Sequence, residues 1–224
     1  MLAHEFTFFP HNDVGIAAGL QATADAFFDK VKKGLNGLHP NFKHSILRDT
    51  DGIMRSGYKQ KNKDSKWEIG GYQSTIICRT MDNPEVFKGE RLSLMIFEEA
   101  GEFKSLKNAY MSSRACFMDG NIQFGVPVIG GTGGDITKSS KDFMEMYYNK
   151  DAYRLVPMFI PASRAYYGYF DIQKGTEDEE GAIEHLTEER DIIHKSGDSE
   201  AYNLHIQNYP ITIEEAFLNT HSAR

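Results

Sequence analysis

The clearest hydrophobic pattern in the chain is an unbroken apolar run that ends at two adjacent carboxylates. The run is Leu94–Phe97, and Glu98 and Glu99 follow it directly. An apolar run of this length, bounded by polar residues, is typical of a strand that is buried on both faces of a parallel sheet. Ligands of open α/β sheets collect at the carboxyl ends of such strands. The pattern therefore predicts a buried strand with an acid pair at a ligand-binding edge.

The chemistry of the acid pair depends on where the strand stops. Neighbours in a strand point to opposite faces, so a continuing strand would aim only one acid into a cleft. The Ala100-Gly101 pair predicts a break that lets Glu99 turn beside Glu98. One carboxylate can then hold a hydrated magnesium ion while the other orients a water against a phosphate. The alternative is that Glu99 and Glu102 are first-turn acids of a following helix, favoured there by the helix dipole.

Strand and helix patterns alternate through the rest of the chain. Further strands are predicted at 74–79, 122–129 and 155–160, and helices at about 21–35, 102–118, 139–149, 177–196 and 199–207. Residues 8–10 predict an edge strand or an extended arm, and Thr212 and Glu215 have the spacing of a capping box. Strands that alternate with helices favour right-handed parallel crossovers in a layered α/β domain.

A glycine-rich turn follows the predicted strand at 122–129. The turn spans residues 130–134, and Thr132 lies one strand–helix–strand unit of roughly 30 residues after Glu99. Glycines there let the backbone approach a ligand closely, and Thr132 offers a hydroxyl toward the group that the acids address. The alternatives are a simple tight turn or a primary phosphate cradle, although the turn lacks the lysine of GxxxxGK[ST] and the spacing of GxGxxG.

No phosphate-binding loop of the GxxxxGK[ST] type occurs in the 224 residues. The nearest candidate, at 15–20, carries no lysine where the charge of a phosphate needs one. Acids that bind magnesium therefore have no partner in this sequence to hold a triphosphate.

Composition limits the other classes of function. Hydrophobic residues make up 40% of the chain and charged residues 25%, and no stretch approaches the roughly 18 apolar residues of a membrane span. A net charge of −7 argues against a protein that is wrapped in nucleic acid by its own field. Lysines do cluster at 59–63, where a solvated loop is the simpler interpretation and a DNA contact the alternative. Cys78 and Cys116 lie in apolar surroundings without metal-ligand spacing, which predicts buried, reduced thiols.

Taken together, the motifs resemble the large subunit of the terminase of tailed bacteriophages, the motor that packages DNA into capsids. Residues 88–103 are similar to the Walker B region of that family, and residues 130–135 to its coupling motif, motif III. Residues 207–217 are similar to the tyrosine-proline and EEAF signature near the end of its ATPase region. The three motifs occur in the family's order, and the resemblance covers about residues 74–217.

The resemblance implies a role for each matching residue. Glu98 would coordinate Mg²⁺ through water, Glu99 would be the general base for ATP hydrolysis, and Thr132 the catalytic coupling residue. Many members of the family have Asp where Glu98 stands, so the metal contact is expected to differ slightly here.

Three further residues are expected to contact the nucleotide. Gly131 and Gly133 would do so through the backbone of the glycine turn. Arg91 is basic and close to the acids in sequence, which suggests a contact with phosphate. The alternative for Arg91 is a surface charge at the start of a strand.

The resemblance also implies a fold and a domain organisation. The fold would be α/β, a three-layer parallel sheet of the additional-strand P-loop ATPase type that lacks the P-loop strand, with a small helical C-terminal subdomain. Residues 1–170 would be a partial ATPase core with Walker B and the coupling motif, and residues 171–224 a helical subdomain that precedes a missing nuclease domain.

The expected function is therefore that of an internal fragment of a viral terminase large subunit. The parent protein would be a Mg²⁺-dependent ATPase that translocates double-stranded DNA into procapsids, and the chain alone is not expected to be active. The resemblance implies a homo-oligomeric ring, the portal protein and the small terminase subunit as partners, no membrane, and the cytoplasm of the bacterial host as location. The alternatives are a fragment of another additional-strand ATPase or helicase, or a non-enzymatic α/β binding module.

Overall fold

The structure is a computed structural model that describes residues 1–133, 140–171 and 173–218. The chain divides into two compact units, Met1–Gly131 and Thr132–Arg224. The first unit contains the sheet, and the described part of the second unit is mainly helical. The domain boundary expected between residues 170 and 171 stays a prediction. No helix in the described part of the chain has the length and apolarity needed to cross a bilayer.

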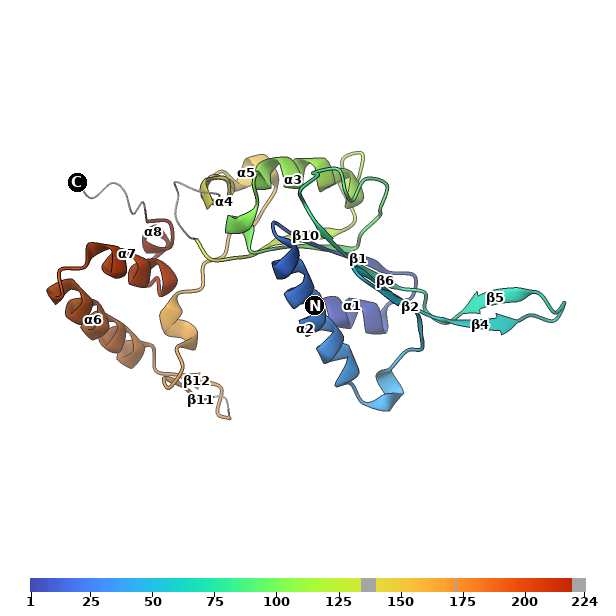
Figure 1. Ribbon diagram of the computed structural model, residues 1–224, viewed down its shortest axis with the longest axis horizontal. Helices are drawn as coiled ribbons and strands as arrows, with labels where there is room; N and C mark the ends of the chain where they lie inside the picture. The colour runs from blue at the N-terminus through green and yellow to red at the C-terminus, as the bar shows by residue number, and fades with distance from the viewer. Residues whose placement is uncertain (134–139, 172, 219–224) are drawn as a thin grey trace. The chain divides into compact units, whose positions relative to one another are not determined.

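The first unit is built on a six-stranded sheet in the order β10-β7-β1-β6-β3-β2 (Figure 1). Its strands are β1 (Asp13–Ala18), β2 (Ile46–Thr50), β3 (Ile53–Ser56), β6 (Thr75–Thr80), β7 (Leu94–Glu98) and β10 (Val126–Ile129). The four strands β10, β7, β1 and β6 run parallel, whereas β3 and β2 continue the sheet as antiparallel strands. Two separate hairpins are β4 (Tyr58–Lys61) with β5 (Trp67–Gly70), and β8 (Met118–Asp119) with β9 (Ile122–Gln123). The sheet is therefore mixed but mostly parallel.

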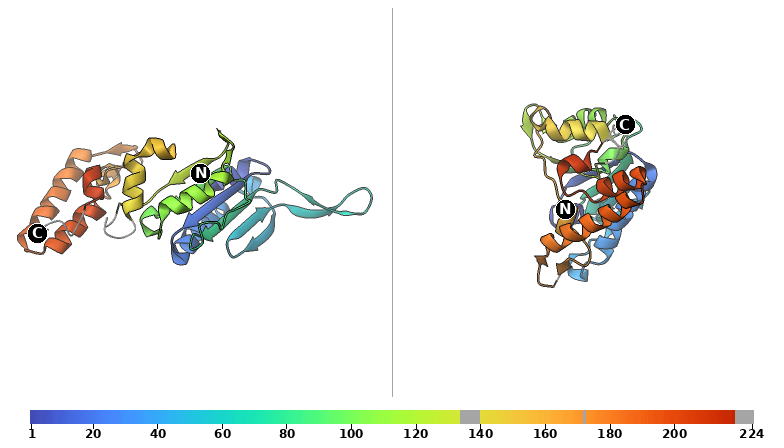
Figure 2. Two further views of the ribbon diagram at one scale, coloured as in Figure 1. Left: turned by 90° about the horizontal axis from the view of Figure 1, so that it is seen from above. Right: turned by 90° about the vertical axis from the view of Figure 1, so that its left-hand side faces the viewer.

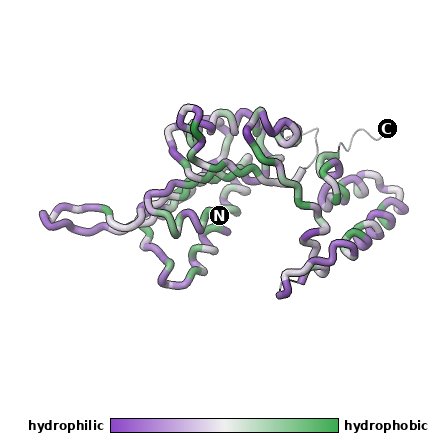
Figure 3. The backbone as a smooth tube through the Cα atoms, turned by 180° about the vertical axis from the view of Figure 1, so that it is seen from behind, coloured by the Kyte–Doolittle hydropathy of each residue, from purple (hydrophilic) through white to green (hydrophobic). Residues whose placement is uncertain are grey.

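Helices cover both faces of this sheet, as Figure 1 shows. Helices α1 (Leu2–Phe8) and α2 (Gln21–Asn36) pack on one face, where Phe6 and Phe28 join the apolar residues of β1, β6 and β7. Helix α3 (Leu106–Ser113) packs on the other face, where Tyr110 contacts the rings of Phe97 and Phe117. Figure 3 shows the hydrophobic colour concentrated along the strands between these layers. The predicted three-layer α/β architecture is confirmed.

Short 3₁₀ helices complete both units. They are η1 (Pro40–Phe42), η2 (Ala100–Glu102), η3 (Arg114–Cys116) and η4 (Ala162–Ala165). The helix predicted over 102–118 is wrong as one continuous element, because η2, α3 and η3 divide that segment. The two cysteines are buried and unpaired, as predicted.

The beginning of the chain differs most from the prediction. Residues 8–10 are not an extended arm, because α1 occupies Leu2–Phe8. The following β1 was not predicted, yet it lies between β6 and β7 in the sheet. Its sequence, DVGIAA, is rich in small residues because the site is crowded: a Cβ on Gly15 would lie 2.6 Å from Cδ1 of Leu92.

Two predicted strands also need correction. The strand expected at 122–129 is divided into β9 and β10 at Gly125, where a Cβ would meet the Leu92 carbonyl oxygen at 2.0 Å. The segment 155–160 has the alternating burial of a strand, with Val156 94% exposed, but no described strand pairs with it. Pro157 removes one of the backbone donors that a sheet ladder would use there.

The second unit confirms the predicted C-terminal helices. Its elements are α4 (Ser140–Tyr148), α5 (Lys150–Tyr153), β11 (Phe170–Asp171), β12 (Thr176–Glu177), α6 (Glu179–Lys195), α7 (Ser199–Asn208) and α8 (Ile213–Ala216). Helices α6 and α7 pack side by side (Figure 2). The predicted capping box is present at the start of α8, where Thr212 and Glu215 exchange hydrogen bonds.

An ion pair holds α8 to α6 within this unit. The Arg190 guanidinium donates to both carboxylate oxygens of Glu215 at 3.0 Å, and also to the Tyr209 carbonyl at 2.9 Å. Burial alone would raise the pKa of Glu215, but hydrogen bonds from Arg190 and from the Ile211 amide hold the pKa below its ordinary value. Besides its predicted place in the capping box, Glu215 therefore makes an ion pair that the sequence did not reveal.

Replacing Glu215 tests this ion pair. Glu215→Gln leaves the mostly buried Arg190 charge without its partner, so we expect the free energy of unfolding to fall by about 3 kcal/mol at neutral pH. Because the pKa of Glu215 is lowered in the folded state, its stabilisation is present above the unfolded pKa and is lost as the pH falls through the folded pKa. Urea unfolding at several pH values measures both effects. The exposed neighbour Glu214→Gln is the matched control, and an equal loss in both variants would contradict the role of the pair.

Candidate functional site

The side chains of β7 alternate between the two faces of the sheet. Leu94 and Ile96 belong to the apolar cluster under α1 and α2, and Phe97 contacts Phe103 and Tyr110 on the other face. Glu98 continues the alternation onto the α2 face at the carboxyl end of the strand. It pairs there with Ala18, the last residue of β1, so the acid stands where two parallel strands end together.

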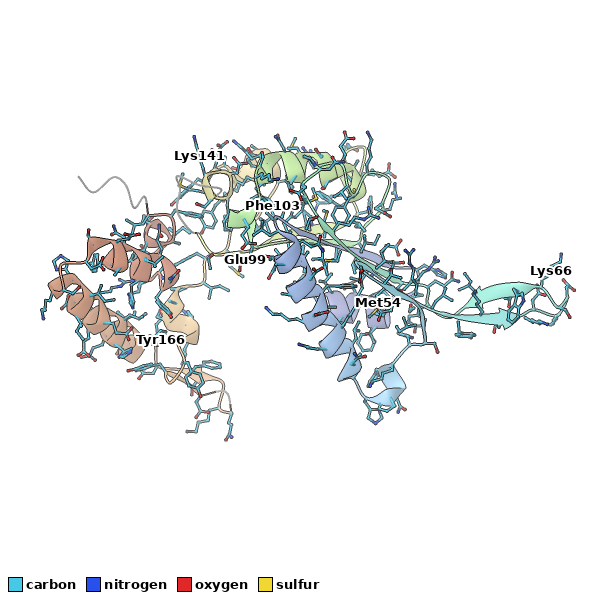
Figure 4. The ribbon with its side chains drawn as sticks, in the orientation of Figure 1. Met54, Lys66, Glu99, Phe103, Lys141 and Tyr166 are labelled. Carbon is cyan, nitrogen blue, oxygen red and sulfur yellow. The ribbon has the colours of Figure 1, made fainter. Side chains whose placement is uncertain are left out.

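Glu99 turns the chain immediately after Glu98. Its backbone is left-handed, with φ 49° and ψ 65°, and it is the residue from which η2 begins (Figure 4). A residue with a Cβ pays about 1–2 kcal/mol for this conformation. The expected break therefore occurs one residue earlier than Ala100-Gly101 and releases Glu99 from the strand alternation.

Glu98 and Glu99 interact electrostatically. Burial is the main cause that raises the pKa of Glu98, and the neighbouring charges of Glu99 and Glu102 raise it further. Lys30, on α2, acts in the opposite direction but does not cancel these effects. The arrangement disfavours the ionised form of Glu98, and carboxyls shifted in this way by burial and like charges cluster at functional sites.

The helix-capping alternative for Glu99 and Glu102 is compatible with their positions at the start of η2. Although Glu99 occupies the N-cap position of η2, its side chain accepts no capping hydrogen bond. The Glu102 carboxylate accepts a 2.6 Å hydrogen bond from Thr23 of α2. The turn before α2 also packs closely here, since a Cβ on Gly19 would lie 2.4 Å from the Glu102 carbonyl oxygen.

The glycine turn after β10 lies directly against the acid turn. β10 pairs in parallel with β7, and the Gly130 carbonyl accepts a hydrogen bond of 2.9 Å from the Ala100 amide. A Cβ on Gly131 would lie 2.6 Å from the Ala100 nitrogen and 3.1 Å from Cα of Glu99. Gly131 also has a φ of 156°, so this position requires glycine. The structure thus brings two predicted residues, Glu99 and Gly131, together.

The remaining described residues of the glycine turn after Gly131 belong to the second unit. Thr132 is exposed and follows Gly131 as the first residue of the second unit. Gly133 is buried within that unit, where a Cβ would overlap the Ala216 carbonyl oxygen at 1.8 Å. This close approach gives Gly133 a packing role against α8. The turn's residues 134–135 lie outside the described residues.

Arg91 stands before the amino end of β7, whereas Glu98 ends the strand. Its guanidinium pairs with Asp119 at 3.3 Å and lies 4.5 Å from the ring centroid of Phe124. The side chain is 63% exposed. The structure therefore does not bring Arg91 to the acids, and its contact with a nucleotide stays a prediction.

Sequence reasoning missed the residues that α2 contributes. Thr23 hydrogen-bonds Glu102, and the charge of Lys30 reaches Glu98. The two positions are seven residues apart, which places them on one face of a helix. This spacing was readable from the sequence, but the position of α2 beside β7 was not.

The two carboxylates at the end of β7 suit Mg²⁺ better than a metal ion that is coordinated by protein side chains alone. No group of three or more histidine, cysteine, aspartate or glutamate side chains in the described residues can hold an ion by itself. Magnesium instead takes one or two carboxylates and completes its octahedron with waters and phosphate oxygens. Glu98 and Glu99 would supply these carboxylates.

The raised pKa of Glu98 makes a prediction about stability. A carboxyl with a raised pKa binds its proton more tightly in the folded state, so its contribution is greatest at low pH and is lost as the pH rises through the folded pKa. We therefore expect Glu98→Gln to melt at a higher temperature than the unmodified chain at pH 7. The difference in melting temperature should vanish below pH 4.5, the ordinary pKa of a glutamate.

Thermal unfolding between pH 3 and pH 8 measures this effect. The exposed Glu85→Gln is the control, and it should shift the melting temperature little at any pH. A Glu98→Gln variant that melts lower than the unmodified chain at pH 7 would show that the ionised carboxylate stabilises the fold.

Comparisons with known proteins find similarity in structure alone. No protein-family model matches the sequence, and no curated protein matches it. The Thermus phage P74-26 large terminase ATPase domain is similar with a TM-score of 0.54 and 12% identity, over 93% of this chain and 79% of that one. The HK97 bacteriophage large terminase is similar with a TM-score of 0.52 and 11% identity, over 94% of this chain and 42% of that one.

A third similar structure, a mutant form of the Thermus phage domain, matches at a TM-score of 0.44 and 14% identity over 60% of this chain. The chain spans 53% of that structure and less than half of the HK97 protein. Identities this low establish the architecture and not the chemistry. The chain has the fold of the ATPase domain of phage large terminases.

Proposed function

We propose that this chain supplies the acid half of the ATPase site of a terminase-type DNA-packaging motor. The observation that carries the proposal is the turn at the end of β7, where a left-handed Glu99 follows the partly buried Glu98 and its backbone packs on Gly131. A strained residue and an acid with a raised pKa, next to each other at the carboxyl end of a parallel strand, are typical of a catalytic site.

Each acid has a distinct role in this proposal. Burial and the charges of Glu99 and Glu102 raise the pKa of Glu98, and a Mg²⁺ ion that this carboxyl holds through water would offset both effects. Glu99 would orient the attacking water and accept its proton. Bound Mg²⁺ would neutralise charge that develops on the phosphate oxygens of ATP. Thr132, within the glycine turn, would couple this chemistry to DNA translocation, with Gly131, Gly133 and Arg91 as further nucleotide contacts.

In this proposal the phosphate-binding half of the site would come from a segment outside these 224 residues, which contain no GxxxxGK[ST]. The described sheet has two edges, and β10 is the one that adjoins β7. The backbone amides of Val126 and Gly130 donate toward β7. The backbone polar groups of Pro127 and Ile129 therefore face the open edge of β10. Pro127 lacks an amide donor, but the two carbonyls and the Ile129 amide remain for pairing. A parallel strand that pairs here would end at the same edge of the sheet as Glu98, with β10 between the two strands.

The proposed biological setting follows from the same function. The whole protein would hydrolyse ATP as a homo-oligomeric ring, act on double-stranded DNA with the portal protein and the small terminase subunit, and work in the cytoplasm of the bacterial host. The helicase alternative would need further DNA-contact motifs after Thr132, and the sequence offers none.

An ATP hydrolysis assay tests whether the chain lacks the phosphate-binding half of the site. We expect the chain alone to release no phosphate from ATP and Mg²⁺ above background. A fusion that adds a strand and a GxxxxGK[ST] loop upstream should restore Mg²⁺-dependent turnover, and Glu99→Gln should lower this turnover about 10²- to 10⁴-fold, as expected for loss of a general base. Steady turnover by the unfused chain that depends on Glu99 would contradict the missing phosphate grip.

Metal binding can be tested on the chain as it exists. Mn²⁺, a paramagnetic substitute for Mg²⁺, should broaden the NMR signals of the Glu98 and Glu99 carboxyls, and Glu98→Gln should weaken this effect. Glu85→Gln should leave it unchanged. Broadening that is spread evenly over all surface acids would count against a site at the end of β7.

A further inference from the structure

The hairpin β4–β5 extends away from the sheet of the first unit (Figures 1 and 2). It continues the antiparallel pair β3–β6 beyond the point where Arg55 pairs with Thr75. Gly57 and Gly71 face each other at the junction with left-handed φ values of 138° and 88°, and a Cβ on Gly71 would lie 3.1 Å from Cα of Gly57. The hairpin is therefore joined to the sheet at two closely packed glycines.

One face of the hairpin combines cationic and apolar side chains. The register pairs Lys61 with Trp67 and Lys59 with Ile69, and directly paired residues of antiparallel strands point to the same face. Trp67 is 69% exposed and Ile69 is 42% exposed. The Lys61 ammonium lies 5.4 Å from the centroid of the Trp67 ring, within the range of a cation–π contact. None of this apolar surface serves the core.

The other face of the hairpin contains its only strand acid. Glu68 accepts a 2.8 Å hydrogen bond from Gln60, the residue that it pairs with. The Tyr58 ring covers Gly70 on this face, where a Cβ would lie 2.8 Å from a ring carbon. The acid is therefore turned away from Lys59 and Lys61.

The hairpin turn adds two lysines in an ordered loop. The Asn62 side-chain oxygen accepts hydrogen bonds of 3.0 Å from the amides of Asp64 and Lys66. Lys63 and Lys66 of this loop are exposed, and Figure 4 labels Lys66 near the tip of the hairpin. None of the hairpin's four lysines pairs with a carboxylate among the described residues. Their charges are therefore available to a ligand.

We infer that the hairpin β4–β5 is a binding site for duplex DNA, which it holds through the backbone phosphates. The hairpin carries four exposed lysines and two acids and is therefore locally positive, although the whole chain carries a charge of −7. The major groove of duplex DNA, about 12 Å wide, admits a two-stranded ribbon. Lysines would bind phosphates as point charges, while Trp67 and Ile69 would cover sugar or methyl surface. The choice of DNA among polyanions rests on the proposed function.

The site is separate from the acid pair. The hairpin leaves the sheet at the amino end of β6, whereas Glu98 ends β7, and β6 and β7 run parallel on either side of β1. Changes at the hairpin should therefore leave the chemistry at Glu98 and Glu99 untouched. DNA binding can be measured without nucleotide, so failure of one proposal does not imply failure of the other.

The only tryptophan of the chain reports on this site directly. We expect a DNA duplex without ATP or Mg²⁺ to quench or shift the emission of Trp67, in proportion to binding measured by fluorescence anisotropy of labelled duplex. Replacing Lys59, Lys61, Lys63 and Lys66 together by Gln should weaken DNA binding at least about tenfold. The plot of log association constant against log salt concentration should become less steep by about 3 to 4.

A charge-matched control separates the hairpin from the overall field. Replacing the exposed Lys88, Lys104, Lys174 and Lys195 by Gln removes the same charge and should leave the salt slope nearly unchanged. Circular dichroism should show the same fold for both variants.

Three outcomes would overturn the inference. The first is Trp67 emission that saturating duplex leaves unchanged while anisotropy rises. The second is equal weakening of binding by the two sets of substitutions. The third is tighter binding of single-stranded DNA or RNA than of the duplex, which would assign the ribbon to exposed bases.

Discussion

The parallel pairing of β7 between β1 and β10 is the constraint on which the rest of the first unit depends. The register places Glu98 beside Ala18 and Phe97 beside Ile129, so three strands end at one edge. Parallel strands must be connected by crossovers, and the crossover after β7 carries α3 over one face while α2 lies on the other. The acids stand at this edge because the apolar run that buries β7 stops there.

The carboxyl edge of β7 contains two unfavourable features next to each other. Glu98 is held where ionisation is disfavoured, and Glu99 has a backbone conformation that suits glycine. Both persist because their surroundings are packed: Ala100 and Phe103 are buried, and Gly131 leaves no space at the turn. Neither feature adds stability to the fold, and such features are typical of sites where function uses the strain.

The sequence predicted elements whose patterns are local and missed those whose cause is a distant contact. The continuous apolar run of β7, the helical period of α2 and the capping box of α8 all follow from neighbours in the chain. By contrast, β1 was not predicted, because its small residues, which make room for Leu92 77 positions later, lack the pattern of a strand. The acid pair was predictable from the end of the run, whereas the roles of Thr23 and Lys30 depend on where α2 packs.

The hairpin shows why net charge is a limited guide to binding. A charge of −7 excludes a protein that holds nucleic acid through its overall field, but at physiological ionic strength a charge is felt only over about 8 Å. The lysines of β4 and β5 stand on a ribbon that leaves the sheet, and Glu68 on that ribbon is turned to the other face. A phosphate at this face therefore meets the local lysines and not the average of the chain. The same screening keeps the acids at Glu98 and Glu99 from repelling a polyanion bound at the far end of the sheet.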